Sequence, residues 1–515
     1  MSIFNYKLSN TLATIMFGTA LTFTGCGSDD DDDTTPTTEV ETGENTEVET
    51  GENTEVETGE NTEVETGENT EVETGENTEV ETGENTEVET GENTEVETGE
   101  NTEVETGENT ETETEVETGE NTETETEISS NGYEFSQTAI QNVSGEITED
   151  TTWTNDKVWQ LSGSVNVIAP AVLTIEAGTV VTGANGADYL AINTGAKIHA
   201  EGTAESPIIF TSLQDLAGQG AVSQWGGLTI LGNAQSNKGT SVYEAGTQNF
   251  ASESADANGE SSGVLKYVQI KYTGFEVEAD KELNGLSLAG VGSGTEIDHI
   301  EVYVGGDDGI ELWGGTANLS HVAIIGAGDD SLDWTDGWTG TADHVYIHQT
   351  ENVTSDDPRG IEADSNGDNP TLEPISNPTI SNMTIVADDE NAQQGILLRR
   401  GTSASISNSI VVGSREKSCL EFRDSATLDT QPIFENVVLG GGCSAHFGGD
   451  DGVEADGVQN QFEAGTNNSV SDEVDPMAIA QSYEGDDYIG AFDPNAESKW
   501  TDGWTHEFIQ PKFVQ

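Results

Sequence analysis

A ladder of near-aligned segments between residues 264 and 450 constrains the fold of this chain most. Each segment begins with a small residue and then alternates apolar and polar side chains. The rungs are residues 285–288, 309–312, 331–334, 360–363 and 395–398, with weaker rungs at 418–420 and 442–444. A unit with such short strands cannot bury its own apolar side, whereas stacked neighbours can. The sequence therefore predicts an all-β parallel β-helix with one coil per repeat.

A second aligned element precedes the rungs and advances with them. Its central residues are His299, His321, His344, Asn382, Asn408 and Asn436. Stacked imidazoles could bind a transition metal. The asparagines at the same position in later coils favour a structural stack that satisfies backbone groups in a turn.

The first 25 residues are typical of a lipoprotein signal peptide. A short apolar run ends in Thr24, Gly25 and Cys26, and it is too short to span a bilayer. We expect Cys26 to become the lipidated N-terminus, followed by an acidic linker over residues 26–37. A cleaved secretory peptide with an incidental cysteine is the alternative.

Residues 38–127 form a repetitive stalk. The octapeptide TEVETGEN occurs nine times, up to Asn109, and a degenerate tail of the same letters runs to Glu127 without Lys or Arg. Such a segment cannot bury enough apolar surface to order itself, and like charges extend it. We expect a disordered spacer, although slippage of a repetitive gene would leave the same pattern.

The folded part is expected over residues 128–515, with a C-terminal cap. Of the 99 acidic and 15 basic residues, 40 acids and one base precede residue 128, which leaves a charge near −45 for this part. Such a charge excludes nucleic acid as a natural partner. It indicates divalent cations, or neutral and cation-bridged partners such as carbohydrate or a surface protein.

Two cysteines of the folded part, Cys419 and Cys443, lie about one coil apart, and we expect them at the same register in adjacent rungs. Adjacent strands are about 4.8 Å apart, which is close enough for a disulfide. An exported protein favours that disulfide over two buried thiols.

Several motifs resemble one family over most of residues 140–505. They are residues 173–180, 195–203, 206–212 and 224–232, the acidic runs around Asp308 and Asp330, and residues 488–492 with 500–504. These resemble the right-handed parallel β-helix surface lipoproteins of Gram-negative bacteria. The resemblance implies attachment to the outer membrane and display at the cell surface, but it implies no activity.

An acidic column is the predicted site. Alternation places Ile310, Leu332, Ile361 and Ile396 inside and an acid outside on three successive coils. The candidate metal ligands are Asp308, Glu311, Asp330, Asp333, Glu362 and Asp364. Stacked carboxylates repel unless a cation neutralises them, and calcium prefers oxygen ligands.

Two features bear on this calcium hypothesis. Residues 364–368 carry oxygen-bearing side chains at alternate positions, as at the start of a calcium loop, but they lack the remainder of an EF-hand. The Asp-Asp pairs that enter the rungs, including Asp356-Asp357, could equally be turn formers at the corners of the coils.

Catalysis remains a further alternative. Paired carboxylates such as Asp329 and Asp330 can act as acid and base on a glycosidic bond, as in polygalacturonase-type enzymes. Those enzymes also need Gly-His-Gly and Arg-Ile-Lys tripeptides, which this sequence lacks. A lyase would use an arginine as base, and Arg359, Arg399 and Arg400 could bind a uronate. A structural ion pair is the alternative role for Arg359.

Five tryptophans are predicted to be exposed and suited to stacking on carbohydrate, whereas Trp153 and Trp334 are expected to be buried. The five are Trp225, Trp313, Trp338, Trp500 and Trp504. Filling of corners and capping of ends is the alternative role. With Arg359, Trp313 and Trp338 are the proposed ligand-binding residues.

Three functions stay open. The first is a non-enzymatic binding or adhesion module displayed on a stalk and stabilised by calcium. The second is a polysaccharide lyase or glycoside hydrolase acting on acidic glycans. The third is an accessory lipoprotein that captures a substrate or metal for an outer-membrane transporter.

The lipid anchor gives the first prediction. We expect Cys26→Ser to release the protein from the outer-membrane fraction, because the variant cannot be acylated. Cell fractionation and immunoblotting measure this. Retention of the variant in the outer membrane at the wild-type level would contradict the anchor.

Overall fold

A computed structural model describes residues 140–506, apart from short gaps, and a few short strands elsewhere. The gaps are residues 185, 244–245, 247, 277–282, 351–357, 389–390, 414, 475–477, 483–487 and 497, and the outlying strands lie within residues 38–134 and 512–514. The chain divides into two compact units, residues 1–124 and 125–515. The second unit is the β-helix.

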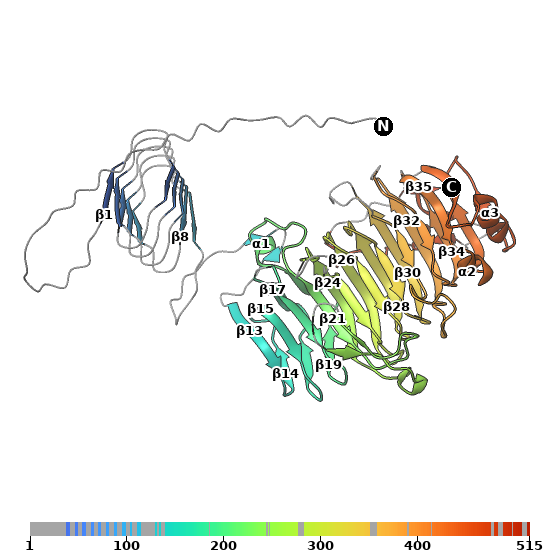
Figure 1. Cartoon of the computed structure of the whole chain (residues 1–515), viewed down its shortest axis with the longest axis horizontal. Helices are drawn as coiled ribbons and strands as arrows, with labels where there is room; N and C mark the ends of the chain where they lie inside the picture. The colour runs from blue at the N-terminus through green and yellow to red at the C-terminus, as the bar shows by residue number, and fades with distance from the viewer. Residues whose placement is uncertain are drawn as a thin grey trace, which may run out of the picture. The chain divides into compact units, whose positions relative to one another are not determined.

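The β-helix joins 24 strands into one parallel sheet that winds through three faces. Figure 1 shows the strands stacked in chain order along the solenoid. The first coils are built by β13 (Ile140–Ile147), β14 (Thr151–Trp153), β15 (Val158–Val167), β16 (Val172–Ile175), β17 (Val180–Gly183), β19 (Lys197–Glu201) and β20 (Ile208–Ser212). The parallel β-helix predicted from the rungs is confirmed, and so is the right-handed form that the resemblance implied.

One face carries the rungs. Its strands are β18 (Tyr189–Ile192), β21 (Gly227–Leu231), β25 (Leu286–Ala289), β27 (Ile310–Trp313), β29 (Leu332–Thr335), β31 (Ile361–Ala363), β33 (Ile396–Leu398), β35 (Arg415–Arg423) and β37 (Cys443–Asp450). Ile310, Leu332, Ile361 and Ile396 pair in direct register, and each is at most 1% exposed. The predicted interior stack is therefore present.

Seven longer strands each bend and supply the other two faces. They are β24 (Gly263–Lys271), β26 (Glu296–Tyr303), β28 (Asn318–Ile325), β30 (Thr341–Gln349), β32 (Thr379–Ala387), β34 (Ser405–Val411) and β36 (Ile433–Leu439). Each bends at one residue with φ between 48° and 58°. These bend residues are Tyr267, His299, His321, His344, Asn382, Asn408 and Asn436. Asn and His tolerate this left-handed conformation better than most residues with a side chain.

The asparagine part of this column is structural. Asn382 Nδ2 donates to Asp343 Oδ1 over 2.7 Å, and Asn408 donates to the Asn382 side-chain oxygen. Asn467, which the sequence analysis did not place in the column, donates to Asn436 Oδ1 over 3.0 Å. The amide stack expected for these positions is confirmed.

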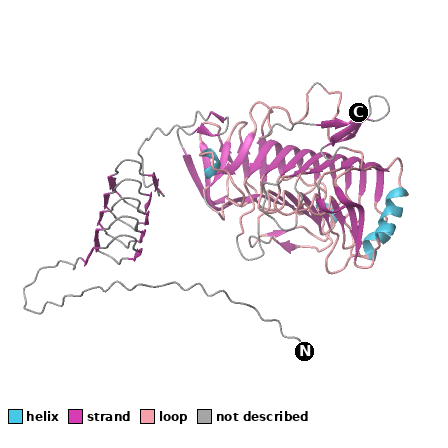
Figure 2. Ribbon diagram, turned by 90° about the horizontal axis from the view of Figure 1, so that it is seen from above, coloured by secondary structure: helices cyan, strands magenta, loops and turns pink. Residues whose placement is uncertain are grey.

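The C-terminal end is capped by a helix. α3 (Ala455–Glu463) buries Val458 and Phe462, and the Phe462 ring packs on Phe434 and Phe447. It lies at the end of the row of strands in Figure 2, and α2 (Ser425–Asp429) contacts it. The chain then continues through β38 (Ser469–Val470), β39 (Ala478–Ser482), β40 (Tyr488–Gly490) and β41 (Lys512–Val514).

Residues 488–506, the return segment, lie along the side of the solenoid instead of capping its end. Ala491 N donates to Thr384 Oγ1 over 2.8 Å, and His506 N donates to Glu301 Oε2 over 2.8 Å. The segment thus crosses the coils in reverse order and buries outward-facing side chains, among them Glu301 at 0% exposure.

The disulfide between Cys419 and Cys443 is present, with the Cα atoms 5.6 Å apart. The two residues are not direct register partners, because Cys443 pairs with Arg415 and the register shifts before Ser418. The predicted bond is confirmed, but the predicted shared register is wrong.

The remaining elements are short. They are α1 (Leu213–Leu216), the 3-10 helix η1 (Ala255–Ala257), and the antiparallel pairs β22 (Ser241–Val242) with β23 (Asn249–Phe250) and β11 (Ser129–Ser130) with β12 (Tyr133–Glu134). Among the described residues, no helix has the length and apolar character needed to cross a membrane.

Within the stalk, the structure pairs short strands in parallel, two octapeptides apart. One sheet holds β1 (Thr38–Glu41), β3 (Thr54–Glu57), β5 (Glu71–Glu73), β7 (Glu87–Glu89) and β9 (Glu103–Glu105), and the other holds β2 (Glu47–Glu49), β4 (Glu63–Glu65), β6 (Glu79–Glu81), β8 (Glu95–Thr98) and β10 (Glu111–Thr114). The register places Glu55 opposite Glu71, and Glu71 opposite Glu87. Like charges directly opposite each other destabilise a sheet. The same repulsion between glutamates is the reason for predicting a disordered spacer at neutral pH.

The interior stack gives a stability prediction. Leu332→Asp should lower the free energy of unfolding by several kcal/mol, because it buries an unpaired charge. Thr379→Asp is the control, since Thr379 is exposed at the start of β32 and should cost less than about 1 kcal/mol. Chemical denaturation measures both. Equal small losses in the two variants would show that the register is wrong.

Candidate functional site

Two neighbouring columns of side chains form the candidate site on the outer surface of the rung-bearing face. The entry column lies directly before the rungs and contains Asn284, Asp308, Asp330, Arg359 and Gln394. Backbone hydrogen bonds fix its alignment, since Gly285 N donates to Asp308 O and Gly309 N to Asp330 O, each over 2.9 Å. The outward column contains Ser287, Glu311, Asp333 and Glu362, which pair in direct register. The predicted stacking of these acids on successive coils is thus present.

The rung that begins at Gly309 leaves no room for a side chain at its first position. A Cβ atom at Gly309 would lie 2.4 Å from Ile324 Cγ2 and 2.6 Å from Ser331 O. The glycine therefore lets adjacent coils approach closely, and this approach brings the acids of the entry and outward columns together.

Two acids of the entry column stabilise the coils themselves. Asp308 Oδ1 accepts a hydrogen bond of 2.8 Å from Asp330 N, and Asp330 Oδ1 accepts one of 3.1 Å from Arg359 N. Each carboxylate thus binds the backbone of the next coil. The turn-former interpretation is correct for these oxygens, but Asp308 keeps a second oxygen for another ligand.

One group of acids joins the entry column to the outward column. Oxygen atoms of Asp308, Glu311 and Asp333 all lie within 4.8 Å of one another. Asn284 Nδ2 donates to Glu311 Oε2 over 2.8 Å. Asp333 Oδ1 is buried and has no hydrogen-bond partner among the described residues. Burial raises the pKa of both Asp308 and Asp333 well above the ordinary value, and the neighbouring carboxylates raise these pKa values further.

A second group shares Asp333 but contains arginine. It joins Asp330, Asp333 and Glu362. Arg359 Nη1 lies 3.0 Å from Glu362 Oε1 and 3.5 Å from Asp330 Oδ1, and Arg399 pairs with the other Glu362 oxygen. Arg359 is only 6% exposed. The alternative role is therefore correct: Arg359 forms a structural ion pair, and its assignment as a ligand-binding residue is wrong.

Asp364 forms ion pairs with two arginines and is part of neither of these carboxylate groups. Its oxygens lie 2.7 Å from Arg399 Nε and 2.6 Å from Arg400 Nη1. Burial raises the pKa of Asp364 to about 6, although Arg400 acts in the opposite direction. A carboxyl group with this pKa is charged at neutral pH, in agreement with its two ion pairs. The structure therefore corrects the prediction of Asp364 as a metal ligand beside Asp333.

The calcium-loop interpretation of residues 364–368 is also corrected. Asn366 Oδ1 accepts hydrogen bonds from Asp368 N over 3.1 Å and from Asn369 N over 2.9 Å. This oxygen thus closes a turn. The predicted neighbouring acids Asp356 and Asp357 lie outside the described residues.

Most of the tryptophans predicted to bind a ligand are buried. Trp225 and Trp338 are 0% exposed and Trp504 is 2% exposed. Trp338 Nε1 donates to Ala317 O over 3.0 Å, inside the solenoid. Trp313 is half-buried at the end of β27, with its ring edge against Tyr243. Of the predicted ligand-binding residues, only Trp313 keeps a partly exposed surface beside the acids.

The Asp329–Asp330 pair does not resemble a catalytic acid and base. The Asp329 side chain is 48% exposed, whereas that of Asp330 is 3% exposed and bonded to the backbone and to Arg359. Only one of the two carboxylates is therefore accessible to a substrate.

Asn284 is the site residue that the sequence analysis missed. It directly precedes a rung, as Asp308 and Asp330 do, so alignment of the rungs would have identified it. Its amide lies at the first coil of the acidic patch, where it binds Glu311 and adds no charge.

The family can now be assigned. A family model described as a pectate-lyase-like β-helix domain matches residues 145–505. This chain therefore belongs to that family. Neither the curated proteins nor the solved structures contain a match to it.

The raised pKa values give a prediction about pH. Between the unfolded and folded pKa values of Asp308 and Asp333, the folded chain binds more protons than the unfolded chain, so stability falls as pH rises. In chelator, the free energy of unfolding of Asp333→Asn should therefore exceed that of the wild type by about 1 kcal/mol at about pH 8, and by little at about pH 4.

Denaturation across this pH range measures the difference between the two proteins. Taking the difference removes the opposite effect of carboxylates such as Asp298 and Asp343, whose pKa values are lowered. Glu416→Gln, at an exposed acid on β35, is the control and should show no such trend. A pH-independent difference for Asp333→Asn would contradict the assigned repulsion.

Proposed function

We propose that this chain is a non-enzymatic binding module in which Asp308, Glu311 and Asp333 hold calcium. The buried Asp333 Oδ1, which has no hydrogen-bond partner among the described residues, carries this proposal, because Asp333 lies in a group of three carboxylates whose oxygen atoms come within 4.8 Å of one another. A buried polar atom without a partner is costly, and a cation with oxygen ligands removes that cost.

The ion would also provide the binding function. Calcium binds about six to eight oxygen ligands. Three carboxylates therefore leave positions for water or for oxygens of a bound molecule. A domain with a charge near −45 repels acidic partners unless a cation bridges them. We therefore propose an acidic glycan as the ligand, bridged by the ion, with the half-buried Trp313 beside it as a stacking surface.

Display at the cell surface completes the proposal. The signal peptide, Cys26 and the acidic stalk support export, attachment to the outer membrane and separation of the β-helix from the membrane. The family is described as pectate-lyase-like. This likeness is compatible with a surface that contacts polysaccharide.

One observation favours a polysaccharide lyase as the second candidate. Burial lowers the pKa of Arg399 to about 10, and neighbouring Arg400 contributes. An arginine with a lowered pKa beside acids suits a base that removes a proton from a calcium-bound uronate. Against it, Arg399 is held by Glu362 and by Asp364.

Calcium-dependent melting tests the proposal. Calcium should raise the melting temperature over that in chelator, by the equivalent of about 2.7 kcal/mol at a hundredfold excess over Kd. Asp333→Asn should lose most of this response, whereas Glu416→Gln should keep it. Identical wild-type curves in calcium and chelator would contradict the ion site.

The same proteins separate binding from catalysis. With uronate polymers and calcium, the wild type should bind the polymer and leave its chain length unchanged. Formation of unsaturated uronate ends by the wild type, and its loss in Arg399→Lys, would show that the protein is a lyase and not a non-enzymatic binding module.

A further inference from the structure

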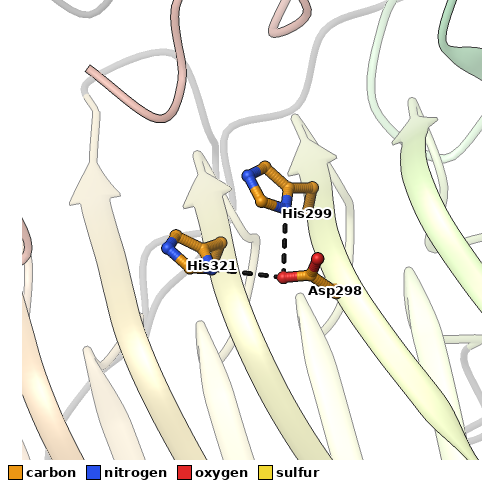
Figure 3. Close-up of side chains that lie close together, drawn as sticks. All are labelled: Asp298, His299 and His321. Atoms are coloured by element: carbon orange, nitrogen blue, oxygen red, sulfur yellow. Dashed lines mark hydrogen bonds and ion pairs between the residues drawn. The ribbon is translucent and has the colours of Figure 1, made fainter. Parts of the chain in front are cut away.

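A second cluster of potential ligands lies at the bends of β26 and β28, away from the rung-bearing face. Asp298 Oδ1 is 3.0 Å from His299 Nδ1 and 3.1 Å from His321 Nδ1, as Figure 3 shows. The three ligand atoms all lie within 4.8 Å of one another. One carboxylate oxygen thus lies between two imidazole nitrogens from adjacent coils.

The backbone alone does not require histidine at these positions. The same bend in later coils carries Asn382 and Asn408, with φ of 54° and 52°, compared with 58° and 51° at His299 and His321. Asparagine therefore satisfies the geometry of the bend. What histidine adds is a nitrogen ligand, and the residue before His299 supplies the carboxylate of Asp298.

The surroundings hold the two rings in place. The His299 and His321 rings stack with their centroids 4.5 Å apart, and Tyr267 continues the stack at 4.3 Å from His299. The edges of Trp500 and Trp504, from the return segment, lie 5.4 Å from His321 and 5.7 Å from His299. An aromatic shell of this kind limits access of water and fixes ring orientation, as outer shells of metal sites do.

The donor set matches a transition metal. Nitrogen and carboxylate ligands bind zinc at about 2.0–2.2 Å, so two ligands on one tetrahedral ion are about 3.3 Å apart. The distances of 3.0 and 3.1 Å are close to this spacing.

We propose that Asp298, His299 and His321 form a binding site for a divalent transition-metal ion such as zinc, nickel or copper. Three protein ligands leave at least one position open on a tetrahedral ion, which water fills. The site is independent of the calcium site, which offers only oxygen.

Titration calorimetry with zinc chloride tests this site on the full chain. Excess calcium is kept present to occupy the acidic column and the stalk. We expect one zinc site whose affinity falls at least tenfold in Asp298→Asn, His299→Asn and His321→Asn. Asparagine is chosen because it occupies the same bend in later coils, and circular dichroism melting checks that each variant folds.

His344→Asn is the matched control. His344 continues the ring stack at 4.7 Å from His321, but its nitrogens face Asp343 and the Tyr488 hydroxyl. This variant should bind zinc as the wild type does. Equal zinc affinity in the wild type and in His299→Asn/His321→Asn would overturn the proposal, and so would an equal loss in His344→Asn.

Discussion

Parallel in-register stacking of the coils is the constraint on which the rest of this structure depends. Each position in a coil lies about 4.8 Å from its equivalent in the next coil, so every side chain contacts others of its own column. A column of apolar residues such as Ile310 and Leu332 becomes a continuous core. A column of asparagines becomes a chain of amide hydrogen bonds. In a column of acids, neighbouring carboxylates repel each other, and their charge must be neutralised by groups outside the column.

The acidic patch shows how this neutralisation is divided. Towards the C-terminal coils, Arg359 and Arg399 supply positive charge to Glu362 and Asp330. Towards the N-terminal coils, Asn284 and Ser287 end the patch with neutral groups. Between these two ends, oxygen atoms of Asp308, Glu311 and Asp333 lie within 4.8 Å of one another. The same stacking that forms the core therefore concentrates negative charge at one place, where protonation or a cation lowers the repulsion.

The sequence predicts what the repeat determines and fails where distant segments cover the solenoid. The rungs predict the interior stack and the outward acids because both follow from alternation along each strand. Alternation cannot predict that Trp504 is buried, because its position depends on the return segment packing over coils more than 200 residues earlier in the chain. Trp338 was misassigned for a related reason, since it lies beyond the strand where alternation no longer applies. Arg359 shares the entry column with acids, and the sequence left an ion pair and ligand binding both open for it; the structure shows its guanidinium beside Asp330 and Glu362.

The central claim is that stacking of the coils creates a cation site at Asp308, Glu311 and Asp333. The most direct measurement is an anomalous-difference map from crystals of the protein grown with terbium, which replaces calcium at oxygen sites. The account predicts a peak about 2.3–2.6 Å from carboxylate oxygens of these three residues, absent in Asp333→Asn. A map without a peak at this position, with Asp333 hydrogen-bonded to a neighbouring carboxyl group instead, would contradict it.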